Sequence, residues 1–297
     1  MKIVSAQKIP SEEIFSRTKE FLLLHEKKCV SLFDRILHHE VRFFLIVGDS
    51  SEQGRGQVEG VFSYSDGGQI LHCLNAPEAN RDSFFRILTS FFSVFSKKAD
   101  FAKLFSVIGE AKGTKIIEDA IFTAARKVPV SYEDSYFFEL NDFAPIVERK
   151  ESFQIEIANM NFFDELKPVQ KAYEEEEVLG ESQEFNPAVS AFLLKKALSR
   201  NALFVALSGR KIVGKAALNA VGENYVQIGG VYTVPEFRKK GIAKSLVQKI
   251  ISEKTSSGKK IVLFAKKKNL PAQKLYESCG FERFGEFRIC YYRTDRA

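Results

Sequence analysis

Residues 231–243 read Val-Tyr-Thr-Val-Pro-Glu-Phe-Arg-Lys-Lys-Gly-Ile-Ala, a predicted strand that runs into a glycine-containing turn and then a helix. The N–H groups at the start of a helix have no partners within it and lie at the positive end of the helix dipole. A pyrophosphate bound there is hydrogen-bonded and stabilised by charge. The small residues Gly241 and Ala243 leave room for it, and the basic residues 238–240 stand beside it. The segment therefore predicts a phosphate-binding turn.

Three predicted elements position this turn. A strand over Tyr225 to Val234 precedes it, a helix over Gly241 to Lys254 follows it, and a second strand covers Lys260 to Ala265. Such a strand–helix–strand unit predicts a βαβ crossover between parallel strands. Gly229 and Gly230 lie inside the first strand and predict a bulge, which would free backbone groups for an extended, amide-bearing ligand such as pantetheine.

A second helix is predicted in residues 269–281, which read Asn-Leu-Pro-Ala-Gln-Lys-Leu-Tyr-Glu-Ser-Cys-Gly-Phe. Asn269 can cap this helix, Pro271 fits its first turn, and Gly280 can end it. One face of the helix carries Ala272, Leu275, Tyr276 and Cys279. Residues at this spacing lie on the same side of a helix, so Tyr276 is expected to point toward the sheet.

Together the two segments resemble the GNAT superfamily of N-acetyltransferases, an α/β fold with a mixed α+β sheet. The Arg/Gln-x-x-Gly-x-Gly/Ala signature of that family corresponds to Arg238-x-x-Gly241-x-Ala243, and its Asn-x-x-Ala-x-x-Leu-Tyr-x-x-x-Gly-Phe helix to residues 269–281. The resemblance covers about Ile155 to Tyr292 and implies acetyl-CoA as cofactor and CoA as product. It implies that the cofactor is bound by Val231, Tyr232, Thr233, Arg238, Lys239, Lys240, Gly241, Ile242, Ala243, Lys244, Asn269, Ala272 and Tyr276.

Acyl transfer to an amine sets two requirements on the site. A free lysine amine, with a pKa near 10.4, is neutral only about once in a few thousand molecules at pH 7, so a base must accept its proton. The departing thiolate must also receive a proton, and we expect Tyr276 to supply it unless it is only a packed core residue. The second half of the chain contains no histidine. Glu176 and Glu177 are therefore the predicted bases, unless the run Glu174 to Glu177 is a solvated acidic face.

The first half predicts a smaller α/β unit, with three antiparallel strands between residues 43 and 74. It resembles the degenerate N-terminal copy of the fold in two-domain GNAT proteins. Residues 75–81 lack the Arg-x-x-Gly-x-Ala pattern, so no CoA site is expected there. Pro145 and a charge run mark a boundary at Asn141 to Glu151, which divides the chain into predicted domains 1–145 and 152–297.

Composition excludes several other classes of protein. The chain has 297 residues, of which 45% are hydrophobic and 28% charged, as in ordinary globular proteins. No apolar run reaches the roughly 20 residues that span a bilayer, and the first residues lack a signal peptide's apolar stretch, so a cytoplasmic location without membrane contact is expected. Cys29, Cys73, Cys279 and Cys290 are scattered, which argues against a zinc site or a disulfide framework.

The net charge of +6 bears on which kind of ligand the protein binds. Basic residues crowd the stretch Arg238 to Lys268, which is either a solvated surface or the binding site of an anion. Nucleic-acid binding is not expected, because the aromatic residues follow core periodicity and a phosphorylated cofactor already accounts for the charge. A non-catalytic acyl-CoA-binding regulatory or interaction protein remains the alternative to an enzyme. The amine acceptor, a small molecule or a protein amine, stays open, as does the choice between monomer and homodimer.

Overall fold

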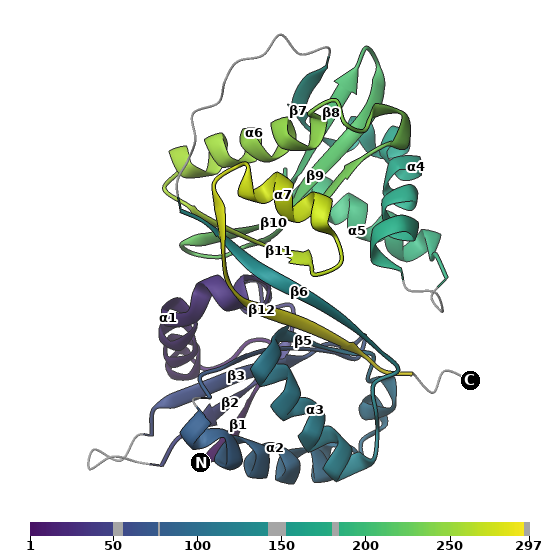
Figure 1. Cartoon of the computed structure of the whole chain (residues 1–297). Coiled ribbons are helices and arrows are strands. Elements are labelled where there is room, and N and C mark those ends of the chain that lie inside the picture. Colours follow the sequence, from purple (N-terminus) through teal and green to yellow (C-terminus); the bar gives the residue numbers. More distant parts are fainter. Residues whose placement is uncertain (50–55, 77, 142–152, 180–183, 294–297) are drawn as a thin grey trace.

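The computed structural model describes residues 1–49, 56–76, 78–141, 153–179 and 184–293. Its strands form one mixed twelve-stranded sheet in the order β1-β2-β3-β4-β5-β12-β6-β11-β10-β9-β8-β7. The two edges of this sheet, β1 and β7, belong to the two halves of the chain. These halves lie at opposite ends of the molecule in Figure 1. The mixed α/β fold expected from the sequence is therefore confirmed.

The N-terminal half follows the order strand, helix, three strands, helix, strand, helix, strand. Its elements are β1 (Lys2–Ala6), α1 (Glu12–Leu37), β2 (Arg42–Val47), β3 (Val58–Tyr64), β4 (Gln69–Leu74), the 3₁₀ turn Glu78–Asn80, α2 (Arg81–Phe95), the 3₁₀ turn Ala99–Lys103, β5 (Ser106–Glu110), α3 (Ala111–Ala125) and β6 (Ser131–Leu140). Helices α2 and α3 cover one face of the sheet and α1 the other, so apolar cores lie on both faces.

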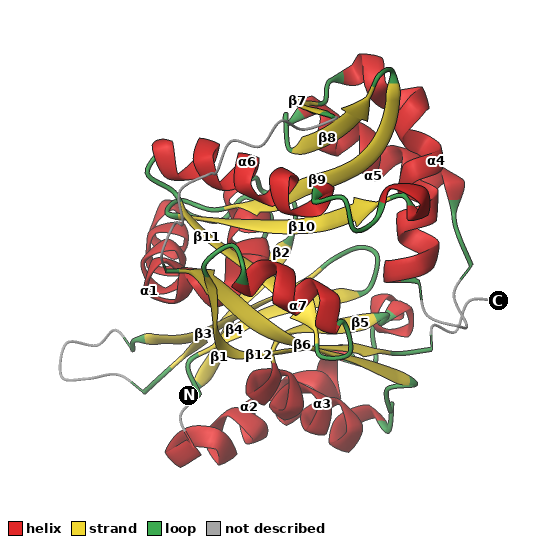
Figure 2. Cartoon of the chain, turned by 45° about the horizontal axis from the view of Figure 1, so that its top comes forward, coloured by secondary structure: helices red, strands yellow, loops and turns green. Residues whose placement is uncertain are grey.

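The C-terminal half repeats this plan with an additional helix. Its elements are β7 (Gln154–Ile157), the 3₁₀ turn Met160–Phe162, α4 (Phe163–Tyr173), the π-helical turn Glu174–Val178, α5 (Pro187–Ser199), β8 (Leu203–Ser208), β9 (Lys211–Val221), β10 (Tyr225–Thr233), the 3₁₀ turn Pro235–Phe237, α6 (Ile242–Ser256), β11 (Lys260–Lys266), α7 (Leu270–Glu277) and β12 (Phe281–Tyr291). Helices α6 and α7 pack on one face and α4 and α5 on the other, as Figure 2 shows.

The last strand of each half pairs with the sheet of the other half. Strand β6 pairs with β11, from Val262↔Glu139 to Lys266↔Ser135, and β12 pairs with β5, from Phe287↔Glu110 to Tyr291↔Ser106. The two exchanged strands also pair with each other and cross between the halves in Figure 1. Because of this exchange, neither half completes its sheet with its own residues.

Helix α1 forms a second connection between the halves. Its Glu26, 1% exposed, accepts hydrogen bonds from the backbone N–H groups of Asn224 and Tyr225 and from the Asn224 side chain, at 2.9–3.1 Å. These residues form the turn between β9 and β10. A buried carboxylate with several donors is well satisfied, so Glu26 holds α1 on the C-terminal half.

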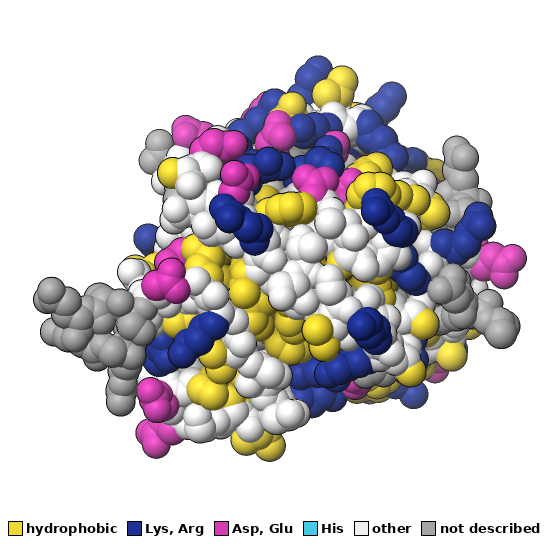
Figure 3. Space-filling model, turned by 90° about the horizontal axis from the view of Figure 1, so that it is seen from below, with side chains coloured by type: hydrophobic (Ala, Val, Ile, Leu, Met, Phe, Trp, Pro, Cys, Tyr) yellow, Lys and Arg dark blue, Asp and Glu magenta, His cyan; other side chains and the backbone are white. Residues whose placement is uncertain are grey.

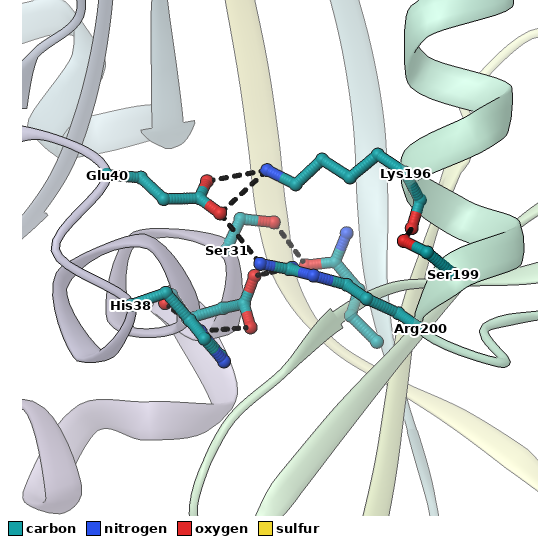
Figure 4. Close-up of polar contacts among 8 residues, drawn as sticks. Ser31, His38, Glu40, Lys196, Ser199 and Arg200 are labelled. Carbon is teal, nitrogen blue, oxygen red and sulfur yellow. Dashed lines mark hydrogen bonds and ion pairs between the residues drawn. The ribbon is translucent and has the colours of Figure 1, made fainter.

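A network of ion pairs lies near the end of α1. Glu40 accepts from Lys196 Nζ with both oxygens at 2.7 Å, and Arg200 Nη2 reaches the same carboxylate at 2.7 Å. Arg200 also approaches Asp34 at 3.5 Å. Figure 4 shows these cations reaching from the α5 region toward carboxylates of the N-terminal half. The network therefore ties α5 to the segment that follows α1.

The outer face of the N-terminal half is formed by α2 and α3. Val94 of α2 and Phe122 of α3 are exposed, at 65% and 43%. Figure 3 views the molecule from below, where these helices lie, and basic side chains form separate groups there among hydrophobic and uncharged ones. Within the described residues, no helix is both long and apolar enough to cross a membrane.

Most predicted elements are confirmed, including the antiparallel strands β2, β3 and β4 and the parallel pair β10 and β11. The apolar periodicity of residues Ile14 to Leu24 predicts a helix there, and the structure extends this helix to Leu37. Strands β1 and β12 had no counterpart in the sequence expectations. The predicted boundary at Asn141 to Glu151 lies almost entirely outside the described residues, so the division into 1–145 and 152–297 stays a prediction.

We predict that Glu26→Ala lowers the free energy of unfolding by about 3 kcal/mol, because it leaves buried donors of Asn224 and Tyr225 without an acceptor. Urea unfolding followed by circular dichroism measures this change. Glu20→Ala, an exposed position on the same helix, is the control and should change stability by less than about 0.5 kcal/mol. Equal stability of the two variants would show that the Glu26 contact does not hold the halves together.

Candidate active site

The strands β10 and β11 separate at the centre of the C-terminal half. Their parallel pairing runs from Tyr225↔Lys260 to Ile228↔Leu263, and both strands then continue without pairing with each other. The register of β10 against β9 shifts between Gly229 and Tyr232, which confirms the predicted bulge. Gly230, at φ +58°, takes a left-handed conformation that glycine adopts at no steric cost. A cleft therefore opens where the sheet loses its regular pairing.

The cleft contains a pocket against α7, which we call the inner pocket. It has a volume of about 260 Å³ and is lined by residues that include Gly229, Gly230, Val231, Ala265, Ala272 and Tyr276. The exchanged strands contribute Glu133 and Ser135 from β6 and Ile289 and Tyr291 from β12. Residues from both halves therefore form the walls of this pocket.

The amino end of α6 follows β10, the strand that forms one side of this cleft. Gly241 precedes the helix at φ +86°, and no side chain caps this end. A Cβ at Gly241 would meet no atom within 4 Å, so space is open around the free N–H groups. Arg238, Lys239 and Lys240 are exposed around the turn, and Lys244 lies in the first turn of the helix. Ile242 is buried against the sheet and fixes the helix there.

Arg238 is held by two contacts. Its Nε donates to the carbonyl of Thr233 at 3.1 Å, and its Nη2 pairs with Glu176 at 2.5 Å. The other oxygen of Glu176 accepts from the Tyr232 hydroxyl at 2.6 Å. The Tyr232 hydrogen bond and the Arg238 charge lower the pKa of Glu176. Glu176 is therefore a partner of the basic turn and stays ionised at neutral pH.

Glu177 lies differently from Glu176. It lines the inner pocket, which Glu176 does not. Both glutamates line a larger outer pocket of about 690 Å³, whose lining also includes Glu133, Lys266, Lys268 and Asn269. Asn269 Nδ2 donates to Glu177 at 3.4 Å, while Asn269 Oδ1 caps α7 by accepting from the Ala272 N–H at 3.1 Å. The structure thus brings Glu177 and Tyr276 to one pocket and places Glu176 beside the α6 turn.

Tyr276 lies on the inward face of α7, as predicted. It is 7% exposed, packs near Phe138 and Phe281, and lines the inner pocket. No hydrogen bond joins its hydroxyl to any residue that the structure describes. Burial raises the pKa of the Tyr276 phenol, and the nearby charge of Glu177 adds to this increase. The hydroxyl therefore stays protonated and is available as a donor in the pocket.

Lys215 on β9 lies at the site but is not among the site residues predicted from the sequence. It is 2% exposed, donates from Nζ to the carbonyl of Gly230 at 3.2 Å, and lies 3.8 Å from the centre of the Tyr173 ring. Burial lowers its pKa to about 7, against the opposing effect of Glu174. The lysine therefore supports the bulge from behind. Its only signal in the sequence is a charged residue within the apolar run 212–218.

The remaining predicted residues form two groups. Val231 lines the cleft, whereas Tyr232 is buried on the opposite side against α4 residues. Cys279 is 3% exposed, and burial raises the pKa of its thiol, as expected for an unreactive core cysteine. Thr233 Oγ1 is buried without a hydrogen-bond partner among the described residues. Of the predicted cofactor residues, Val231, Asn269, Ala272 and Tyr276 line the pockets, and those of 238–244 lie at the start of α6.

The corresponding place in the N-terminal half holds a smaller pocket, of about 230 Å³, whose lining includes His72, Asn75, Glu110 and Gly113. Strands β4 and β5 pair in parallel only from Gln69↔Ser106 to Leu71↔Ile108. The next residue, His72, is 3% exposed, and its ring lies within 3 Å of where a Cβ of Gly109 or Gly113 would be. Its Nε2 is 2.8 Å from Thr114 Oγ1, and burial lowers its pKa to about 3. A neutral imidazole therefore forms part of the wall of this pocket, where the C-terminal pocket has the glycines of β10.

Comparisons with known proteins agree with this geometry. A family model described as the acetyltransferase (GNAT) family matches residues 161–281. No curated protein matches the chain. Among solved structures, the fold is similar to a GNAT-family acetyltransferase from Colwellia psychrerythraea, with 13% identity, a TM-score of 0.58 and coverage of 99% of this chain and 100% of that one.

Two further structures are similar over nearly the whole length. A Drosophila protein is 9% identical, with a TM-score of 0.66 and coverage of 99% of both chains. A tandem GNAT protein from the clavulanic acid biosynthesis pathway is 11% identical, with a TM-score of 0.58 and coverage of 98% of both chains. Residues 161–281 are therefore a domain of the acetyltransferase (GNAT) family, within a chain that has the overall fold of a tandem GNAT protein.

Proposed function

We propose that this protein is an N-acetyltransferase that transfers an acetyl group from acetyl-CoA to a primary amine by direct attack in a ternary complex. One observation carries the proposal: Tyr276 lines the pocket where β10 and β11 separate, and β10 leads into the uncapped, basic amino end of α6. Groups for phosphate binding and for proton donation therefore both lie next to β10. The alternative, a non-catalytic acyl-CoA-binding protein, would use the phosphate-binding turn but has no need of a proton donor at Tyr276.

The residues of the cleft fit an acyl-CoA molecule. The free N–H groups at the start of α6 and the exposed Arg238, Lys239 and Lys240 suit a pyrophosphate. The bulge at Gly229 and Gly230 leaves backbone groups of β10 free of β11, as an amide-bearing pantetheine chain requires. When bound, the cofactor would supply an activated thioester at the inner pocket.

The chain's own groups cover the proton movements of the transfer. A C–N bond forms between the amine and the acyl carbon while the C–S bond breaks, the amine loses a proton, and the thiolate gains one. Tyr276 donates to the sulfur, because its hydroxyl is protonated and faces the pocket. Glu177 receives the amine proton directly or through water, because it lines the same pocket. Of the two predicted bases, we propose Glu177 for this role, since Glu176 is committed to Tyr232 and Arg238.

We predict that the double variant Arg238→Glu, Gly241→Glu loses acetyl-CoA binding by at least about a hundredfold, because carboxylates facing a pyrophosphate cost several kcal/mol. Calorimetric titration of the wild type and the variant with acetyl-CoA measures this loss. Lys254→Glu, at the other end of α6, is the charge control and should bind as the wild type does. Absence of binding by the wild type would contradict the proposed function.

We predict that Tyr276→Phe lowers kcat by about 100-fold or more while the affinity for acetyl-CoA is unchanged, because only the donated proton is lost. The readout is thiol release from acetyl-CoA with the best substrate of a primary-amine panel. The control is Tyr136→Phe on β6, which removes a tyrosine hydroxyl outside the inner and outer pockets and should leave kcat unchanged. Full turnover by Tyr276→Phe at saturating substrates would exclude the phenol as the acid.

A further inference from the structure

A second cavity lies between the two halves, beside the inner pocket. We call it the inter-half cavity; its volume is about 320 Å³, and its lining includes Arg35 and Lys28 of α1, Gln69 of β4 and Gln227 of β10. Asn219, Phe264 and Ile289 line both this cavity and the inner pocket. The two spaces are therefore neighbours, and one small molecule can extend from one into the other.

Arg35 is the unusual residue of this cavity. Its guanidinium makes no hydrogen bond and no ion pair with any residue in the described part of the chain, although the side chain is only partly exposed. Burial lowers the pKa of Arg35, and the charges of Glu40 and Asp34 oppose this decrease. A partly buried cation without a direct partner costs folding free energy, so its retention in a cavity indicates a ligand.

The carboxylates nearest to Arg35 are already neutralised by other cations. Glu40 is bonded to Lys196 and Arg200, and Asp34 is approached by Arg200 and by His38 Nδ1 at 3.3 Å. Figure 4 shows how the α5 region supplies these cations. The positive charge of Arg35 is therefore left for something that enters the cavity.

The lining of the inter-half cavity prefers anions. It contains two cations and no acidic residue among the described residues, and Lys28 is matched by Glu110 at 2.9 Å. Gln227 accepts from Ser31 Oγ at 3.2 Å, and its amide nitrogen has no partner among the described residues. By contrast, the inner pocket carries two carboxylates, Glu133 and Glu177, and one cation, Lys266, which pairs with Glu133 at 3.0 Å. The inner pocket thus has an excess of negative charge, and the excess of positive charge lies one cavity away.

Strand geometry connects the two spaces. Gln227 and Gly229 are two residues apart on β10, so they lie on the same face of the sheet, separated by about 7 Å at roughly 3.3 Å per residue. Gln227 lines the inter-half cavity and Gly229 the inner pocket. An acceptor with an amine at one end and an anionic group a few bonds away can reach both.

We propose that the amine acceptor carries a carboxylate, which enters the inter-half cavity and binds Arg35 and the amide of Gln227. This inference rests on the proposed acetyltransferase function and narrows its substrate class to amino acids or similar amino carboxylates. A guanidinium suits a carboxylate because its N–H groups match both oxygens. The N-terminal half then has a direct role, since Arg35 selects what the C-terminal half acylates.

The test compares amines that differ only in the anionic group. The probes are γ-aminobutyrate, δ-aminovalerate and ε-aminocaproate, the amides of each that lack the carboxylate charge, and O-phosphoethanolamine as an amine that carries a phosphate instead. The wild type should use the best carboxylate with a KM at least about tenfold below that of its amide, as expected for a charge-assisted hydrogen bond. A preference for the phosphate compound over every carboxylate would overturn the assignment of the anion.

Variants at Arg35 separate selectivity from folding. Arg35→Gln should raise the KM of the carboxylate to that of the amide, leave kcat with the amide unchanged, and preserve Tm, because it removes an unpaired, partly buried charge. Arg35→Lys should restore part of the preference. Arg86→Gln, an exposed arginine on α2, is the matched control and should behave as the wild type does.

The outcomes distinguish failure of this inference from failure of the proposed function. If the wild type acetylates amides and carboxylates equally well, or Arg35→Gln keeps the preference, the anion site is wrong and the enzyme proposal stands. If no amine is acetylated, the proposed function fails, and calorimetry with the same probes decides the site. Binding of a carboxylate probe by the wild type and not by Arg35→Gln would then support the site, and no binding would overturn it.

Discussion

The exchange of β6 and β12 between the halves is the constraint on which the rest of the structure depends. Because β6 pairs with β11 and β12 pairs with β5, each half needs the last strand of the other to complete its sheet. A sheet edge left unpaired would expose backbone groups at a cost in free energy, so the halves are obliged to fold together. Glu26 of α1 adds a buried contact that fixes their relative position.

The same exchange explains why the candidate site belongs to both halves. Glu133 and Tyr291 line the inner pocket because their strands lie next to β11 and β5. The two copies of the fold differ where their central strands separate: the buried ring of His72 packs against Gly109 and Gly113 in the first copy, whereas glycines of β10 line the pocket in the second. The N-terminal half also forms part of the wall of the C-terminal pocket, through Glu133 and Ser135.

Sequence reasoning predicted the elements of the C-terminal half well, because its signals are local. Gly241 and Asn269 determine helix starts, and Gly229 with Gly230 determines a bulge, all within a few residues. The exchange of strands could not be predicted, since β6 and β12 have the same alternating pattern whichever sheet they join. The burial of Lys215 and the unpaired charge of Arg35 depend on neighbours that are remote in sequence, so no local pattern marks them.

Hydrogen exchange with and without acetyl-CoA tests the central claim most directly, because it reports on the individual amides at the start of α6. These N–H groups have no partner in the helix and should exchange quickly in the free protein. Addition of acetyl-CoA should slow exchange in residues 238–244 and leave the corresponding start of α2, residues 81–84, unchanged. Unchanged exchange at 238–244, or protection confined to α2, would contradict the placement of the cofactor in the C-terminal half.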